Sequence, residues 1–182
     1  NHLPSQSMNK IIFLDRDGTL NKDDGYTNKV GDYNLLPNTS NGLKKLQSQG
    51  YKLIIVTNQS GIGRGYYTED QMHEFNNHLI NELKQENINI DKVLFCPHTP
   101  QKECDCRKPK TKLIEPYFTP DFDKANSYVI GDRSSDIELA NNAGLKSVLV
   151  TTGSSEKDPE SNSNPTFIAE DLLDAANKIQ NA

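Results

Sequence analysis

The sequence has little that would suit a membrane or a nucleic acid. No apolar run approaches the roughly 20 residues that a membrane-spanning helix needs, and the chain shows no secretory signal segment. Basic residues are outnumbered, with 20 Lys and Arg against 25 Asp and Glu and a net charge of -5. A nucleic-acid-binding domain would more often carry a basic surface. We therefore expect a cytoplasmic enzyme that binds neither nucleic acid nor membrane.

Cysteine is scarce as well, and its distribution excludes a disulfide scaffold. The chain has 3 cysteines, an odd number, and all of them lie between Cys96 and Cys106. Small secreted domains instead spread an even number of cysteines through the chain. Because the three cysteines lie beside a histidine, the cluster indicates a metal site.

The rest of the composition is that of a folded domain. The mean hydropathy of -0.75 is low for a globular protein, but short aliphatic clusters recur along the chain, which argues against disorder. A length of 182 residues suits one domain. Residues 1–7, which precede Met8, are polar and show no pattern, so we interpret them as an expression remnant. Residues 8–182 are expected to form a single domain.

Short apolar runs alternate with amphipathic segments, which predicts an α/β fold. Because the runs are separated by helices, the strands must be joined by crossovers, and the sheet is expected to be mostly parallel. A polar linker is expected over residues 154–165. The expected strands are 11–14, 53–56, 93–95, 128–130, 147–150 and 167–169, and the expected helices are 38–49, 68–86, 137–143 and 171–179.

Acidic residues follow two of the expected strands. Asp15 and Asp17 come directly after the first strand, and Asp132 and Asp136 follow the strand at 128–130. Ligands of such sheets bind beyond the carboxyl ends of the strands. Several carboxylates at one sheet edge would repel one another unless a cation neutralised them. Magnesium, which prefers oxygen ligands and is often shared with a substrate phosphate, is the natural choice.

These motifs resemble those of the haloacid dehalogenase superfamily phosphatases. The segment Asp15-Arg-Asp-Gly-Thr-Leu20 matches the first motif of that superfamily, DxDGT. The second motif is similar to Thr57-Asn58-Gln59, and the fourth is similar to the segment from Gly131 to Asp136. The resemblance covers nearly the whole chain from Met8 to Gly153. It implies a three-layer Rossmann-like fold around the central sheet.

The resemblance also implies roles for the acidic residues. Asp15 would be the nucleophile that forms an aspartyl phosphate. Asp17 would protonate the leaving alcohol and later deprotonate the attacking water. Magnesium would be held by the side chains of Asp15 and Asp132 and by the backbone carbonyl of Asp17. Asp136 is interpreted as a supporting residue at the start of a helix, where its charge suits the helix dipole.

The transferring phosphoryl group needs fixed hydrogen-bond donors. The Thr57 hydroxyl, the backbone at Asn58 and a lysine would supply them. The lysine is expected between the second and fourth motifs, where the candidates are Lys108, Lys110 and Lys112. We choose Lys108 because the family's Arg-Lys-Pro matches Arg107-Lys108-Pro109. Lys110 and Lys112 would then be additional charges.

The cysteine cluster predicts a structural zinc site. Cys96, His98, Cys104 and Cys106 form a Cys3His set within eleven residues, which suits tetrahedral zinc without an open position. The cluster resembles the zinc loop of a small-cap subgroup of the superfamily. That subgroup contains the D-glycero-D-manno-heptose 1,7-bisphosphate phosphatases and the histidinol-phosphate phosphatases. No insert is large enough for a separate cap domain, so short loops must select the substrate.

The two substrates of the subgroup are both compatible with the residues present. The first half of the chain resembles the heptose enzymes, so we favour removal of the 7-phosphate from heptose 1,7-bisphosphate, a lipopolysaccharide precursor. Arg64 or Arg107 would bind the second phosphate. The alternative is histidinol phosphate, from histidine biosynthesis, whose amine would prefer Asp23 or Asp24. We expect a monomer acting on a small phosphorylated metabolite; a non-enzymatic phosphoacceptor or phosphosugar-binding module is the remote alternative.

Overall fold

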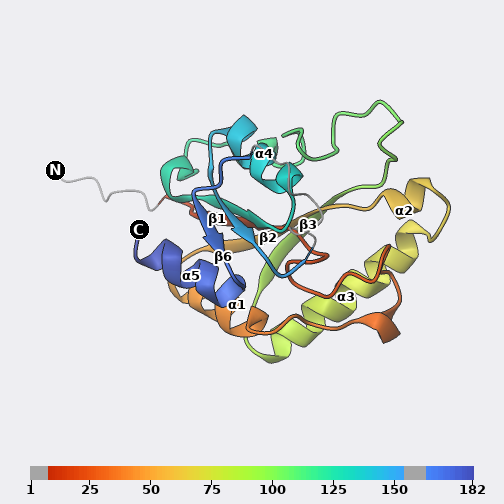
Figure 1. Cartoon of the computed structure of the whole chain (residues 1–182), viewed down its shortest axis with the longest axis horizontal. Helices are drawn as coiled ribbons and strands as arrows, with labels where there is room; N and C mark the ends of the chain where they lie inside the picture. The colour runs from red at the N-terminus through yellow and green to blue at the C-terminus, as the bar shows by residue number, and fades with distance from the viewer. Residues whose placement is uncertain (1–7, 154–162) are drawn as a thin grey trace.

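The computed structural model describes residues 8–153 and 163–182. The segment interpreted as an expression remnant, residues 1–7, lies outside these ranges, and so do residues 154–162 of the expected polar linker. The described residues form a central sheet covered by helices on both faces (Figure 1). No helix among them is long and apolar enough to cross a membrane.

The predicted alternation of strands and helices is confirmed. The strands are β1 (Ile11–Leu14), β2 (Lys52–Asn58), β3 (Ile90–Cys96), β4 (Tyr128–Gly131), β5 (Lys146–Val150) and β6 (Phe167–Ala169). The helices are α1 (Thr39–Ser48), α2 (Ser60–Gly63), α3 (Glu69–Gln85), α4 (Ser134–Ala143) and α5 (Leu172–Gln180). The short helix α2 was not expected from the sequence, because four residues are too few to show the helical spacing of apolar residues.

The six strands have the order β3-β2-β1-β4-β5-β6, and every pairing between them is parallel. Strand β1 therefore lies at the centre, between β2 and β4. The expected mostly parallel sheet is confirmed. This order places the carboxyl ends of β1, β2 and β4 side by side at one edge, which is where the polar motifs were found.

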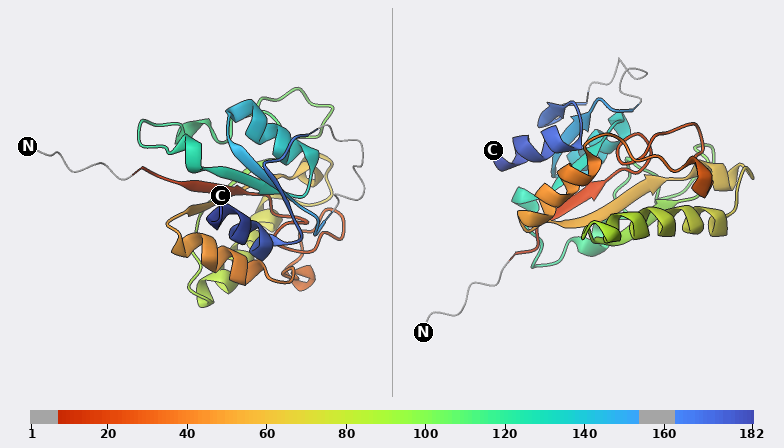
Figure 2. Two further views of the ribbon diagram at one scale, coloured as in Figure 1. Left: turned by 60° about the vertical axis from the view of Figure 1, so that its left-hand side comes forward. Right: turned by 90° about the horizontal axis from the view of Figure 1, so that it is seen from below.

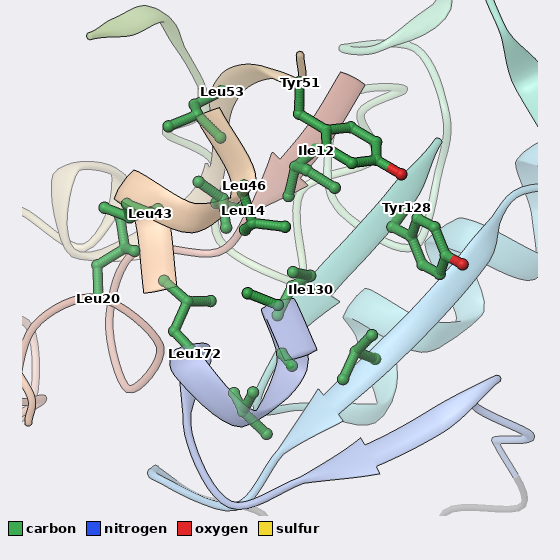
Figure 3. Packing of buried hydrophobic residues seen from close by; sticks show 14 of the residues in the cluster. Ile12, Leu14, Leu20, Leu43, Leu46, Tyr51, Leu53, Tyr128, Ile130 and Leu172 are labelled. Carbon is green, nitrogen blue, oxygen red and sulfur yellow. The ribbon is translucent and has the colours of Figure 1, made fainter. Parts of the chain in front are cut away.

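The two faces of the sheet bury different sets of side chains. Ile12 and Leu14 of β1 face one cluster, which is completed by α1, α3 and α5. Ile11 and Phe13 face the other cluster, which includes residues of α4 and of the irregular segment before β4. Helices α1 and α5 lie side by side in both orientations of the molecule (Figure 2). Figure 3 shows how residues of both helices close over the first face.

The start of helix α4 differs from the expectation. The sequence pattern predicts a helix from residue 137, but the helix begins at Ser134. The backbone N–H of Arg133 donates to Asp136 Oδ2 at 3.2 Å, so Asp136 satisfies a donor at the helix start. Gly144, with a φ of 71°, ends the helix.

Candidate active site

Three of the four acidic residues at the two strand ends come together. Asp15 directly follows β1 and Asp132 directly follows β4, and the backbone N–H of Asp15 donates to Ile130 O at 3.0 Å. Carboxylate oxygens of Asp15, Asp132 and Asp136 all lie within 4.8 Å of one another. All three residues are buried, with exposed fractions of 7%, 1% and 1% respectively. The parallel pairing of β1 with β4 is what brings these residues together.

Lys108 reaches this cluster from a distant part of the chain. Its Nζ donates to Asp15 Oδ1 at 2.9 Å, to Asp136 Oδ1 at 2.7 Å and to Val56 O at 2.7 Å. Its three ammonium hydrogens therefore all have partners. Of the three candidate lysines, Lys108 is the one that the structure brings to Asp15, whereas Lys110 and Lys112 are exposed.

One ammonium group does not balance three buried carboxyl groups. The pKa of Asp15 is raised to about 7. Burial is the main cause, Lys108 opposes it, and the neighbouring Asp132 adds to it. Burial likewise raises the pKa of Asp136 to about 6, with a further contribution from Asp15. Burial alone would lower the pKa of Lys108, but Asp136 and Asp15 raise it above its ordinary value. The cluster therefore favours a charged lysine and additional positive charge.

The residues present fit a magnesium ion. The donor set consists of carboxylate oxygens, the ligands that a hard divalent cation prefers. Two glycines leave space around the Asp132 carboxylate. A Cβ at Gly18 would lie 2.3 Å from Asp132 Oδ2, and a Cβ at Gly153 would lie 2.2 Å from the same atom. Any other residue at either position would collide with this carboxylate.

Asp17 lies apart from the carboxylate cluster and is held by nitrogen donors. Arg16 donates from Nε to Asp17 Oδ1 and from Nη2 to Oδ2, both at 3.0 Å. Asn21 Nδ2 also donates to Oδ1 at 3.0 Å, and Gln59 Nε2 donates to Oδ2 at 3.2 Å. The Arg16 side chain is fully buried and was not singled out from the sequence. The Asp17 carboxylate is thus fixed at the edge of an open pocket.

This pocket has a volume of about 400 Å³ and collects the predicted substrate-binding residues. Those residues are Asp23, Thr57, Asn58, Arg64, Arg107 and Lys108, together with Asp15 and Asp17. The sequence analysis did not assign a role to the other lining residues, which are Gly25, Tyr26, Gln59, Ser60, Tyr67, Arg133 and Ser135. Asn58 binds the backbone of the lysine, since its Oδ1 accepts from the Lys108 N–H at 3.0 Å.

Three arginines, Arg64, Arg107 and Arg133, line the pocket. The guanidinium of Arg64 lies 5.9 Å from the centre of the Tyr26 ring, and Arg133 Nη2 lies 3.6 Å from Asp23 Oδ2. Arg107 Nη1 is buried and has no hydrogen-bond partner among the described residues. A buried guanidinium nitrogen in this position is suited to an anionic ligand.

The cysteines and the histidine of the predicted zinc loop also come together. The ligand atoms of Cys96, His98, Cys104 and Cys106 lie within 4.8 Å of one another. Cys96 Sγ is 2.9 Å from Cys106 Sγ and 3.4 Å from His98 Nδ1. The cysteines form no disulfide.

The donor set of this loop fits zinc. Burial would raise the pKa of Cys104, but backbone N–H groups of Cys106 and Arg107 donate to its sulfur and lower the pKa to about 6. The thiolate is the form that binds a metal. Three sulfurs and one imidazole nitrogen make up a closed tetrahedral set.

Comparison with known proteins agrees with this geometry. Residues 105–175 match the HAD-hydrolase-like family. The chain is 41% identical over 153 residues to the D-glycero-beta-D-manno-heptose-1,7-bisphosphate 7-phosphatase of Haemophilus ducreyi, covering 79% of this chain and 84% of the relative. It is 43% identical over 145 residues to a probable D-glycero-D-manno-heptose-1,7-bisphosphate 7-phosphatase of Thermoplasma acidophilum, covering 78% and 90% of the two chains.

The chain belongs to the haloacid dehalogenase-like phosphatases. A solved structure similar to this phosphatase is that of D,D-heptose 1,7-bisphosphate phosphatase from B. bronchiseptica, complexed with magnesium and phosphate. The TM-score is 0.86 at 29% identity, over 95% of this chain and 99% of that one. The predicted fold class and the predicted phosphatase class are therefore confirmed.

Proposed function

We propose that this phosphatase removes the 7-phosphate of D-glycero-D-manno-heptose 1,7-bisphosphate in a magnesium-dependent reaction through an aspartyl phosphate on Asp15. The proposal depends on one observation above all. A buried carboxylate, fixed by Lys108, lies in a pocket that three arginines also line. Such a pocket offers cationic groups in addition to Lys108, as a bisphosphate requires. The names of the relatives support the same substrate.

In the first step, an oxygen of Asp15 attacks phosphorus and the bond from phosphorus to the sugar oxygen breaks. Asp17 gives its proton to that oxygen, so the sugar leaves as an alcohol. In the second step Asp17 takes a proton from water, whose oxygen attacks phosphorus. The bond to Asp15 breaks, inorganic phosphate is released and Asp17 is again protonated.

Donors around Asp15 hold the phosphoryl group during both steps. The Thr57 hydroxyl accepts a hydrogen bond from Gln59 Nε2 at 2.8 Å, so its own proton is available for a phosphate oxygen. The backbone at Asn58 supplies a further donor. Lys108, whose three hydrogens are taken by Asp15, Asp136 and Val56, adds positive charge beside Asp15. When bound to Asp15, Asp132 and the Asp17 carbonyl, magnesium would keep Asp15 ionised and offset the negative charge of the phosphate.

The Cys3His loop is assigned to a structural zinc ion, held by Cys96, His98, Cys104 and Cys106. This loop directly precedes Arg107 and Lys108 in the chain. Zinc would therefore fix the segment that brings Arg107 to the pocket and Lys108 to Asp15. A cytoplasmic location, a monomeric state and a single domain over residues 8–182 remain predictions.

Histidinol phosphate is the second candidate, because Asp23 lines the pocket. Its carboxylate is the group that would attract the amine of that substrate. However, Arg133 Nη2 lies 3.6 Å from Asp23 Oδ2, so this carboxylate already faces a cation. Heptose bisphosphate is therefore preferred.

Side-by-side kinetics test this function. We expect kcat/KM for heptose bisphosphate to exceed that for histidinol phosphate by at least about 100-fold. Histidinol phosphate has no second phosphate for Arg107, and leaving a buried cationic group without its partner is costly. Arg107→Ala should lower kcat/KM for the bisphosphate about tenfold and that for p-nitrophenyl phosphate less than about twofold. Asp15→Asn should abolish turnover of every substrate. A preference for histidinol phosphate would overturn the substrate, and activity of Asp15→Asn would overturn the covalent mechanism.

A further inference from the structure

Asp17 receives one hydrogen bond from outside its own loop. Arg16 and Asn21 belong to the same turn as Asp17, whereas Gln59 follows β2. The Gln59 amide nitrogen donates to Asp17 Oδ2 at 3.2 Å and to Thr57 Oγ1 at 2.8 Å. One side-chain amide thus links the carboxylate assigned to proton transfer with the hydroxyl assigned to the phosphate.

The direction of this amide is decisive for Asp17. A side-chain amide has a donor end and an acceptor end of nearly the same shape. Between the two steps the Asp17 carboxylate is ionised and only accepts hydrogen bonds, so a reversed amide would then place two oxygens against each other. The Tyr67 hydroxyl fixes the direction, because it donates to Gln59 Oε1. Tyr67 is 6% exposed, and its burial raises its pKa to about 12, which keeps the hydroxyl protonated.

The position of Tyr67 is in turn set by a glycine. A Cβ at Gly61 would lie 2.2 Å from Tyr67 Cε1 and 2.8 Å from Cζ. The ring therefore packs directly on the backbone of α2, and no larger residue fits at Gly61. This contact explains why residue 61, in the segment that follows Gln59, is a glycine. The sequence alone gave no reason for a glycine at this position.

We propose that Tyr67 is a positioning residue for proton transfer, which acts by holding the Gln59 amide with its donor end toward Asp17 and Thr57. The inference rests on the proposed function, because it takes Asp17 to be the proton donor to the leaving alcohol. Tyr67 itself does not touch the reacting atoms. It determines whether the Asp17 carboxylate is aimed at the leaving oxygen when phosphorus is attacked.

The test compares leaving groups that need a proton with one that does not. The ratio of kcat/KM for a sugar phosphate to kcat/KM for p-nitrophenyl phosphate reports protonation, because nitrophenolate leaves readily without a proton. We expect Tyr67→Phe to lower this ratio about fivefold, the factor implied by loss of one ordinary hydrogen bond. Gly61→Ala, which displaces the same ring, should lower the ratio in the same direction.

Tyr66→Phe is the matched control, since Tyr66 is 61% exposed and does not line the pocket; its ratio should not change. Asp17→Asn should lower the ratio by about 100-fold or more. If Asp17→Asn leaves the ratio unchanged, the proposed role of Asp17 is wrong. If Asp17→Asn lowers the ratio but Tyr67→Phe reduces both substrates equally, only the positioning role of Tyr67 is overturned.

Discussion

The carboxylate cluster and the cysteine cluster are built in opposite ways. Asp15 and the lysine that binds it are 93 positions apart in the sequence, and both are buried among the ends of the central strands. The cysteine cluster spans only positions 96 to 106, and all of its members except Cys96 are partly exposed. The carboxylate cluster therefore depends on the whole sheet, whereas the cysteine cluster can be held together locally by the four side chains assigned to zinc. Removing one group should consequently have different effects at the two places.

The largest effect is expected at Lys108. Lys108→Met leaves Asp15 and Asp136 buried without their cation, which should cost about 3–5 kcal/mol of the free energy of unfolding. Activity should fall by at least about 100-fold, because the positive charge beside Asp15 is lost. Urea denaturation and steady-state kinetics measure the two effects. The control is Lys112→Met, since that side chain is 66% exposed and lies 3.8 Å from Asp105. Equal stability of the two variants would contradict the dependence of the carboxylate cluster on Lys108.

A smaller and more local effect is expected at the cysteine cluster. The purified protein should contain about one zinc per chain, and Cys106→Ala should release it. We expect the far-UV circular dichroism to stay unchanged, because the loop contains little of the sheet. The KM for the bisphosphate should rise several-fold as Arg107 loses its fixed position. Glu103→Gln, an exposed change in the same loop, should retain zinc. Loss of the whole sheet in Cys106→Ala would show that this loop is not locally built.

The smallest effect is a dependence of stability on pH in the metal-free protein. Burial raises the pKa of Asp15 to about 7, whereas the unfolded chain loses this proton near pH 4. Between these values the folded protein holds the extra proton, so its stability falls as the pH rises from about 4 to about 7.

The measurement is the urea midpoint in the presence of a chelator, for the parent protein and for Asp15→Asn. The stability of the parent relative to the variant should decrease across this range, and added magnesium should reverse the decrease at neutral pH. A relative stability that increases with pH would show that Lys108 outweighs burial at Asp15.

The sequence predicted the parts of the site that are marked by local motifs. Asp15 and Asp132 could be found because each directly follows an apolar run, and parallel strands bring such positions to one edge. Lys108 could be chosen because Arg107-Lys108-Pro109 follows the cysteine cluster. Each of these signals spans only a few neighbouring residues, although the contacts that they predict join residues far apart in the sequence.

The supporting residues could not be predicted in this way. Arg16 would ordinarily be exposed in a loop, but it is buried because it binds Asp17, the Thr27 carbonyl and Asn76 of α3. Thr27 and Asn76 lie outside the motif, so the motif alone does not predict these contacts. Tyr67 likewise has no local signal, since its role depends on the packing against Gly61. The early start of α4 was missed because the cap is made by Asp136, a residue already assigned to the acidic motif.

Pairing of β1 with β4 continues one residue beyond the strands, since the Asp15 N–H donates to Ile130 O. The main chain of Asp15 is therefore as stiff as the sheet, and only two side-chain torsions separate it from the oxygen that we propose attacks phosphorus. A glutamate at this position would add a third torsion. Its carboxylate would be positioned less precisely, although its charge would be the same. Reach and rigidity, as much as acidity, explain why the shorter of the two acidic amino acids stands here.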